Sequence, residues 1–100
     1  MQITITQEGA KAIIALNGKL SVATSPDLEA AISGLPESTN EFDIDLSQLE
    51  YISSAGLRVL VSTEKLANQR SGSMVLLHPN DEVLEVFDMT GLTDIFTIEK

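Results

Sequence analysis

Residues 42–60 read FDIDLSQLEYISSAGLRVL, and this stretch decides the fold prediction. Apolar and acidic residues alternate over residues 41–46, which is the period of two expected of a strand. Residues 47–52 form a short connector that leads to two serines, Ser53 and Ser54. A helical spacing of apolar residues then begins at Leu57 and continues to about residue 70. The stretch therefore predicts a strand, a connector and a helix, in that order.

Strand and helix patterns continue on the N-terminal side. Residues 1–6 and 11–17 have the patterns of two strands, joined by a turn at residues 7–10. A helix is predicted to follow, with Ser25 as its capping residue and Pro26 at its first helical position. The short turn between the two strands predicts that they pair antiparallel.

The C-terminal side repeats the alternation of strand and helix. Residues 73–77 are an apolar strand, and Pro79-Asn80-Asp81 has the composition of a helix start. Thr90-Gly91 ends that helix, and residues 94–98 are predicted to form a last strand. The order is β-β-α-β-α-β-α-β, and strands separated by helices require a largely parallel sheet. We therefore expect an α/β fold with a mixed, mostly parallel sheet and helices packed mainly on one face.

Composition restricts the function. The chain has 100 residues, enough for one domain, and its formal charge is −9. Binding to nucleic acid or to an anionic membrane is not expected, because such binding depends on cationic side chains. Cysteine is absent and His78 is the only histidine, so we expect no metal site, no cofactor and no enzymatic activity. With no targeting or membrane-spanning pattern, a cytoplasmic protein is expected. The charge of −9 disfavours self-association, so we expect a monomer when the protein is free.

The strongest candidate site is the pair of hydroxyls at the start of the second predicted helix. The start of a helix has free backbone N–H groups and a partial positive charge, so it accommodates a phosphate on a serine. Gly56 is expected to keep the backbone open to close approach by another molecule. The alternative is that Ser54 only caps the helix.

Three further residues are weaker candidates. His78 ends a predicted strand and is interpreted as structural or solvated rather than catalytic. Asp43 and Asp45 share one face of a strand, a spacing compatible with an acid/base pair or a magnesium site. The favoured interpretation is that one of these aspartates anchors the following loop through backbone N–H groups.

The chain resembles the STAS domain, specifically bacterial anti-sigma factor antagonists. Residues 42–60 resemble the signature of the family, residues 17–28 its Gly-x-Leu turn and first helix, and residues 83–92 its last helix and Gly-Leu exit. Together these segments cover nearly the whole chain in the order of the family, which implies a single STAS domain over residues 1–100.

The resemblance implies a partner switch. Members of this family bind an anti-sigma factor, often a serine kinase, and so release a sigma factor; the kinase phosphorylates the antagonist and a serine phosphatase resets it. The family's phosphoserine stands two residues before the motif glycine, which is Ser54 here, with Ser53 as the alternative acceptor in place of the family's usual aspartate. The expected partner-binding residues lie in two segments: Leu20, Ser21, Val22, Ala23 and Thr24, and Ser54, Ala55, Gly56, Leu57 and Arg58.

Arg58 stands one helical turn after Ser54, where it is expected either to reach a phosphate or a partner carboxylate or to remain a solvated side chain. Two other functions remain open. The first is a STAS subunit that docks constitutively in a larger complex, such as a transporter-associated or stressosome-like assembly. The second is an enzyme or small-molecule binder, which the absence of a glycine-rich phosphate loop disfavours.

Overall fold

Five strands form one sheet whose spatial order follows the chain, β1-β2-β3-β4-β5, in the computed structural model of residues 1–100. The strands are β1 (Gln2–Glu8), β2 (Lys11–Leu20), β3 (Glu41–Ile52), β4 (Ser73–Leu77) and β5 (Thr97–Glu99). β1 pairs antiparallel with β2, and all other neighbours are parallel. The predicted mixed, mostly parallel sheet is confirmed.

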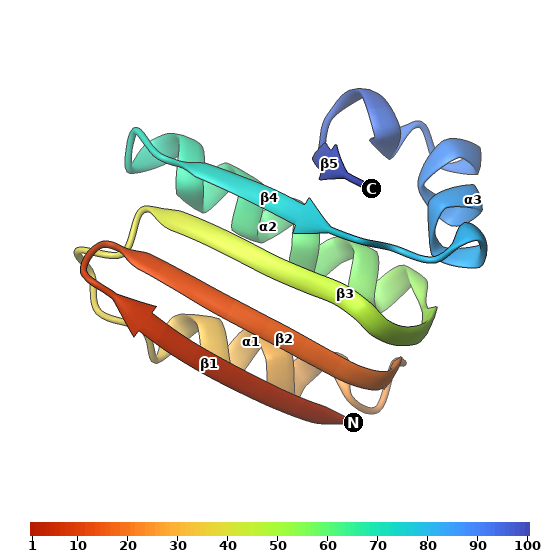
Figure 1. Ribbon diagram of the computed structural model, residues 1–100, viewed down its shortest axis with the longest axis horizontal. Coiled ribbons are helices and arrows are strands. Elements are labelled where there is room, and N and C mark those ends of the chain that lie inside the picture. The colour runs from red at the N-terminus through yellow and green to blue at the C-terminus, as the bar shows by residue number, and fades with distance from the viewer.

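The helices are α1 (Ser25–Ser33), α2 (Ser54–Gln69) and α3 (Asp81–Met89), followed by a short 3₁₀ helix, η1 (Leu92–Asp94). Figure 1 shows α1 and α2 behind the sheet, on the same face, and α3 beyond the end toward which β3 and β4 run. The predicted element order and one-sided helix packing are confirmed. None of the helices is both long enough and apolar enough to cross a membrane.

The core lies between the sheet and the helices on its covered face. On the central strand β3 the side chains alternate, so that Ile44 is fully buried while the aspartates on either side of it are half-buried. In the sheet register, Ile44 lies between Ile14 and Leu76, which are also fully buried. Near the C-terminus of the chain, the ring of Phe87 in α3 packs edge to face against that of Phe96, with centroids 5.5 Å apart. This contact fixes α3 against the segment before β5.

Two strands are longer than the sequence predicts. The predicted connector over residues 47–52 is wrong, because β3 continues to Ile52 and its second half pairs with β2, which itself extends to Leu20. Register shifts near Asn17 and Gly18 allow this continuation. These irregularities break the alternation on which the sequence prediction depends.

The last strand is shorter and later than predicted, at Thr97–Glu99 rather than residues 94–98. The N–H groups of Ile95 and Phe96 donate to the carbonyl of Leu92, which holds the preceding residues in a helical turn. Ser25 does not cap α1: Thr24 occupies the cap position, and the buried hydroxyl of Ser25 donates to the Ser21 carbonyl.

Candidate functional site

The start of α2 separates the two serines into different roles. The Oγ of Ser53 accepts a hydrogen bond from the Gly56 N–H at 3.1 Å, so Ser53 is the capping residue, and its side chain is buried. Ser54 is the first residue of the helix and is exposed. The alternative interpretation that Ser54 only caps the helix is therefore wrong. Ser54 is exposed to solvent, whereas the hydroxyl of Ser53 is buried and already bonded to the Gly56 N–H.

The local electrostatics at this helix end favour a negative group. Ser53 satisfies two of the first helical N–H groups, that of Gly56 through its side chain and that of Leu57 through its carbonyl at 2.9 Å. The N–H groups of Ser54 and Ala55 precede these and have no helical acceptor. The first turn of α2 contains no acidic residue that would already neutralise the helix dipole. Arg58 lies one turn further on and is exposed.

Gly56 is required by the packing of this chain rather than by a partner. It is buried, and a Cβ added to it would lie 2.7 Å from Cγ and 2.8 Å from Cδ2 of Leu20, and 3.0 Å from Cγ1 of Ile52. The prediction that Gly56 admits another molecule is wrong, because the space beside it is filled by the protein's own core. The glycine allows α2 to begin directly against the end of β2.

The β2–α1 loop is held in place by its own hydroxyls. Thr24 Oγ1 accepts a hydrogen bond from the Ser21 N–H at 2.8 Å and donates one to the Lys19 carbonyl at 2.8 Å. The loop is also tied to the start of α2, because the Ser53 N–H donates to the Leu20 carbonyl at 2.8 Å. The two predicted contact segments, distant in sequence, therefore lie side by side.

Burial divides the predicted contact residues into three groups. Leu20, Gly56 and Leu57 are buried, so they support the surface from within, and their contact with a partner stays a prediction. Ser21, Thr24 and Ala55 are half-buried. The exposed residues are Val22, Ala23, Ser54 and Arg58, which we call the docking surface. An apolar side chain as exposed as Val22, at 70%, suits a contact with another protein.

Tyr51 is an exposed aromatic residue that the sequence pattern does not mark as part of the site. Its side chain is 50% exposed, two residues before Ser53, and it lines a shallow hollow with residues of α3 that include Glu82 and Val86. The signal was present in the sequence as a tyrosine close to the proposed phosphorylation site, because tyrosine is enriched in protein contacts.

The aspartates of β3 are held by the fold. Asp43 forms an ion pair with Lys11 at 2.8 Å, and this hydrogen bond together with the opposite charge raises the pKa of Lys11 above its ordinary value. Asp45 accepts a hydrogen bond from the Ser47 N–H at 2.9 Å, so the predicted bond from an aspartate to a following N–H is present, although Ser47 belongs to β3 and not to the predicted loop. No three His, Asp or Glu side chains are grouped so that they could hold a metal ion.

His78 is exposed at the end of β4 and has a positive φ of 55°. Its backbone N–H donates to the carbonyl of Glu99 at 2.7 Å, which joins the end of β4 to β5. The interpretation of His78 as a structural or solvated residue agrees with this position.

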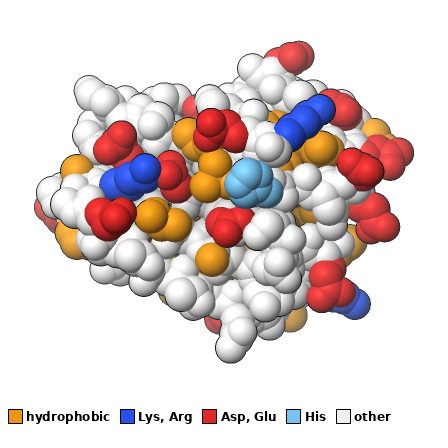
Figure 2. Space-filling model, viewed as in Figure 1, with side chains coloured by type: hydrophobic (Ala, Val, Ile, Leu, Met, Phe, Trp, Pro, Cys, Tyr) orange, Lys and Arg blue, Asp and Glu red, His pale blue; other side chains and the backbone are white.

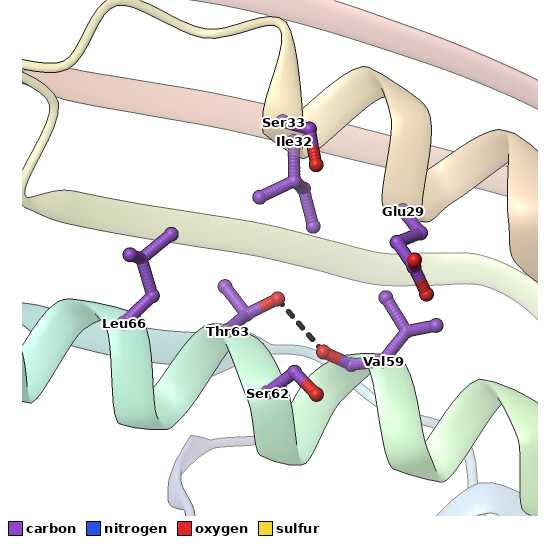
Figure 3. A pocket seen from close by; sticks show the side chains of 7 residues that line it. All are labelled: Glu29, Ile32, Ser33, Val59, Ser62, Thr63 and Leu66. Carbon is purple, nitrogen blue, oxygen red and sulfur yellow. Dashed lines mark hydrogen bonds between the residues drawn. The ribbon is translucent and has the colours of Figure 1, made fainter.

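A hollow of about 100 Å³ lies between α1 and α2, with Ile32, Val59 and Leu66 among its lining residues (Figure 3). The hydroxyl of Thr63 within it is already satisfied, because it donates to the Val59 carbonyl at 2.8 Å. With Glu29 as its only charged residue, the hollow provides no convergent set of polar groups for a small ligand.

Comparison with known proteins agrees with this architecture. A family model described as Mlab, STAS domain, matches residues 3–98. The chain belongs to the STAS domain family. BtrV of Bordetella bronchiseptica is 33% identical over 99 residues, which are 98% of this chain and 85% of BtrV. The anti-sigma-B factor antagonist of Staphylococcus epidermidis is 30% identical over 88 residues, 87% of this chain and 82% of that protein.

Solved STAS structures share the fold. The anti-sigma factor antagonist SpoIIAA in its unphosphorylated form superposes with a TM-score of 0.80 at 16% identity, over 99% of this chain and 88% of SpoIIAA. The Bacillus cell fate determinant SpoIIAA in its phosphorylated form gives a TM-score of 0.78 at 18% identity, over 99% and 92% of the two chains. At these identities the likeness shows the fold alone.

Proposed function

We propose that this STAS protein is an anti-sigma factor antagonist, which binds an anti-sigma factor and thereby releases a sigma factor. The name of the Staphylococcus epidermidis relative supports this function. The docking surface supports it physically, because it combines an exposed apolar side chain, Val22, with the small residues Ala23 and Ser54. Small side chains at the start of α2 permit close packing by a partner. In this proposal the protein acts in the cytoplasm, is a monomer when free, and catalyses no reaction.

The finer proposal is that the partner is a serine kinase and that phosphorylation of Ser54 ends the complex. The observation that carries it is the division between the serines: Ser53 caps α2 while Ser54 is exposed and available. A phosphate adds about −1.5 to −2 charges at neutral pH. At Ser54 it lies at the positive end of α2, so the fold tolerates it, and Arg58 is within one turn. A docked partner meets new bulk and charge in the middle of its contact.

A phosphorylation assay tests the kinase step. The protein is incubated with ATP and a purified serine-kinase anti-sigma factor from the same organism, and then analysed by intact mass and peptide mapping. One added phosphate on Ser54 is expected, and a serine phosphatase should remove it. The matched Ser54→Ala variant should gain none. A phosphate mapped to Ser53 would overturn the assignment, because it would require the capping hydroxyl to leave its hydrogen bond with Gly56.

A binding experiment tests the charge effect separately. Ser54→Asp should bind the anti-sigma factor at least about tenfold more weakly than Ser54→Ala, a difference of about 1.4 kcal/mol. The reason is that only the aspartate places a negative charge in the contact, while both variants keep the Ser53 cap. Isothermal titration calorimetry measures both affinities. Equal affinities would contradict the electrostatic mechanism even if Ser54 is phosphorylated.

A constitutive adaptor is the second candidate function. Two observations favour it: the matching family model carries the name Mlab rather than that of an antagonist, and Ser53 stands where the family usually has an aspartate. In this case the docking surface holds the protein in a larger assembly, transporter-associated or stressosome-like, without modification. Partner binding that remains intact with no phosphate transferred in the assay would favour the adaptor over the switch.

A further inference from the structure

The face of the sheet opposite α1 and α2 is not covered by any helix (Figure 1). Figure 2 views the molecule from this side and shows hydrophobic side chains near the centre of the face, beside the histidine and an acidic side chain, with further acidic and some basic side chains around them. The central side chains of this face are half-buried by their neighbours in the sheet. The face is therefore flat, partly apolar and without a partner in the chain.

The strand register arranges this face as two parallel rows. In one row Asp43 lies between Ile13 of β2 and Val75 of β4. In the next row Asp45 lies between Ala15 and Leu77. Each central carboxylate is thus flanked by aliphatic side chains on both neighbouring strands.

The two carboxylates differ in one respect. Asp43 is paired with Lys11 at 2.8 Å, whereas Asp45 has no cationic partner and makes a single hydrogen bond, to the Ser47 N–H. A cation that arrives with apolar groups suits this unpaired, half-buried carboxylate, because the apolar groups cover the aliphatic neighbours while the exclusion of water strengthens the attraction between the two charges.

The net charge of the whole face is negative, like that of the central aspartates. Its strand residues include five carboxylates and two lysines, Lys11 and Lys19, and Lys11 lies among Asp43, Glu41 and Glu8. The five carboxylates are Glu8, Glu41, Asp43, Asp45 and Glu99. A second copy of the chain would bring two such acidic faces together, which like-charge repulsion opposes. A cationic partner matches the face.

We propose that this open sheet face is a second protein-binding surface, for a segment that presents one arginine or lysine between aliphatic side chains. The cation pairs with Asp45, and the aliphatic groups cover Ile13, Ala15, Val75 and Leu77. The docking surface at the start of α2 is a different set of residues, so neither its occupation nor a charge at Ser54 closes the sheet face. The protein is then able to hold two partners at once.

A designed peptide tests the proposal without knowledge of the natural partner. The probe is a 14-residue helical peptide with one arginine between leucines on one face and alanine and glutamine elsewhere. A matched peptide carries citrulline, which keeps the shape of arginine and removes its charge. Titration into the ¹⁵N-labelled protein should give saturable shifts at Ile13, Asp45, Val75 and Leu77. Replacement of arginine by citrulline should weaken binding about threefold to fivefold.

The variant Asp45→Asn isolates the ion pair, because asparagine Oδ1 still accepts the Ser47 N–H. In this variant the arginine and citrulline peptides should bind equally, whereas Glu37→Gln, in an exposed loop, should retain the difference. Ser54→Asp should bind the arginine peptide as the wild type does, which separates this result from the proposed switch. Absence of saturable binding, shifts on another face, shifts that depend only on protein concentration, or an unchanged preference for arginine in Asp45→Asn would each overturn the proposal.

Discussion

The substitution Gly56→Ala should destabilise the protein even though alanine is the better helix former. The added Cβ would lie 2.7–2.8 Å from Leu20, closer than Cβ atoms approach other atoms in real proteins, and 3.0 Å from Ile52, which is a tight contact. Both neighbours are core residues, 0% and 3% exposed, so neither has free space into which to move. Overpacking of this kind costs about 1–3 kcal/mol, and the gain in helix propensity returns at most about 1 kcal/mol. With the full propensity gain, we expect a net loss of up to about 2 kcal/mol in the free energy of unfolding.

Urea unfolding followed by circular dichroism measures this loss, and the melting temperature should fall by about 4–8 °C for each kcal/mol in a domain of this size. Gly34→Ala is the matched control, because its Cβ would lie no closer than 3.4 Å to another atom and Gly34 has an ordinary φ of −81°. The control should be neutral or slightly stabilising. If Gly56→Ala is as stable as the control, the close packing between α2 and Leu20 does not govern this site.

Two further variants test the helix α3 and a half-buried carboxyl, that of Glu64. Asn80→Ala removes the side chain that accepts the Val83 N–H and donates to the Leu49 carbonyl. The free energy of unfolding, measured in urea, should fall by about 1–2 kcal/mol, and an unchanged unfolding midpoint would contradict this. Burial raises the pKa of Glu64 above its ordinary 4.5, because the fold favours the protonated carboxyl. This contribution to the free energy of unfolding is fully present below the unfolded-state pKa and is lost as the pH rises through the folded-state pKa. Glu64→Gln should therefore exceed the wild type in stability at neutral pH, with the gap closing toward about pH 4, and a gap independent of pH would refute the assignment.

Local periodicity was sufficient to predict the order of the elements along the chain. The alternation around Ile44 and the spacing from Leu57 report directly which side chains face the core, so β3 and α2 were found where the sequence places them. The second half of β3 was missed, because residues 48–52 pair with β2 only after register shifts that interrupt the alternation. Register between distant segments is not encoded in the local pattern.

The same limit applies to the candidate site. Sequence and family resemblance identified the segment that contains Ser53 and Ser54, but the assignment of the cap depends on which hydroxyl reaches the Gly56 N–H. The packing of Gly56 against the core could not be predicted from the sequence either, since nothing in the local pattern shows that Leu20 fills the space beside it. The open face at Asp45 required the strand register, which sets its neighbours.

The agreement between chain order and sheet order has a consequence for synthesis. Each strand from β2 onward joins an edge that the preceding strand has already provided, so the sheet is able to grow from one side as the chain emerges from the ribosome. β5 completes the sheet last and contributes only three residues. A nascent chain that has reached the end of β4 already holds every residue of both proposed binding surfaces except Glu99, so partner recruitment need not wait for the C-terminus.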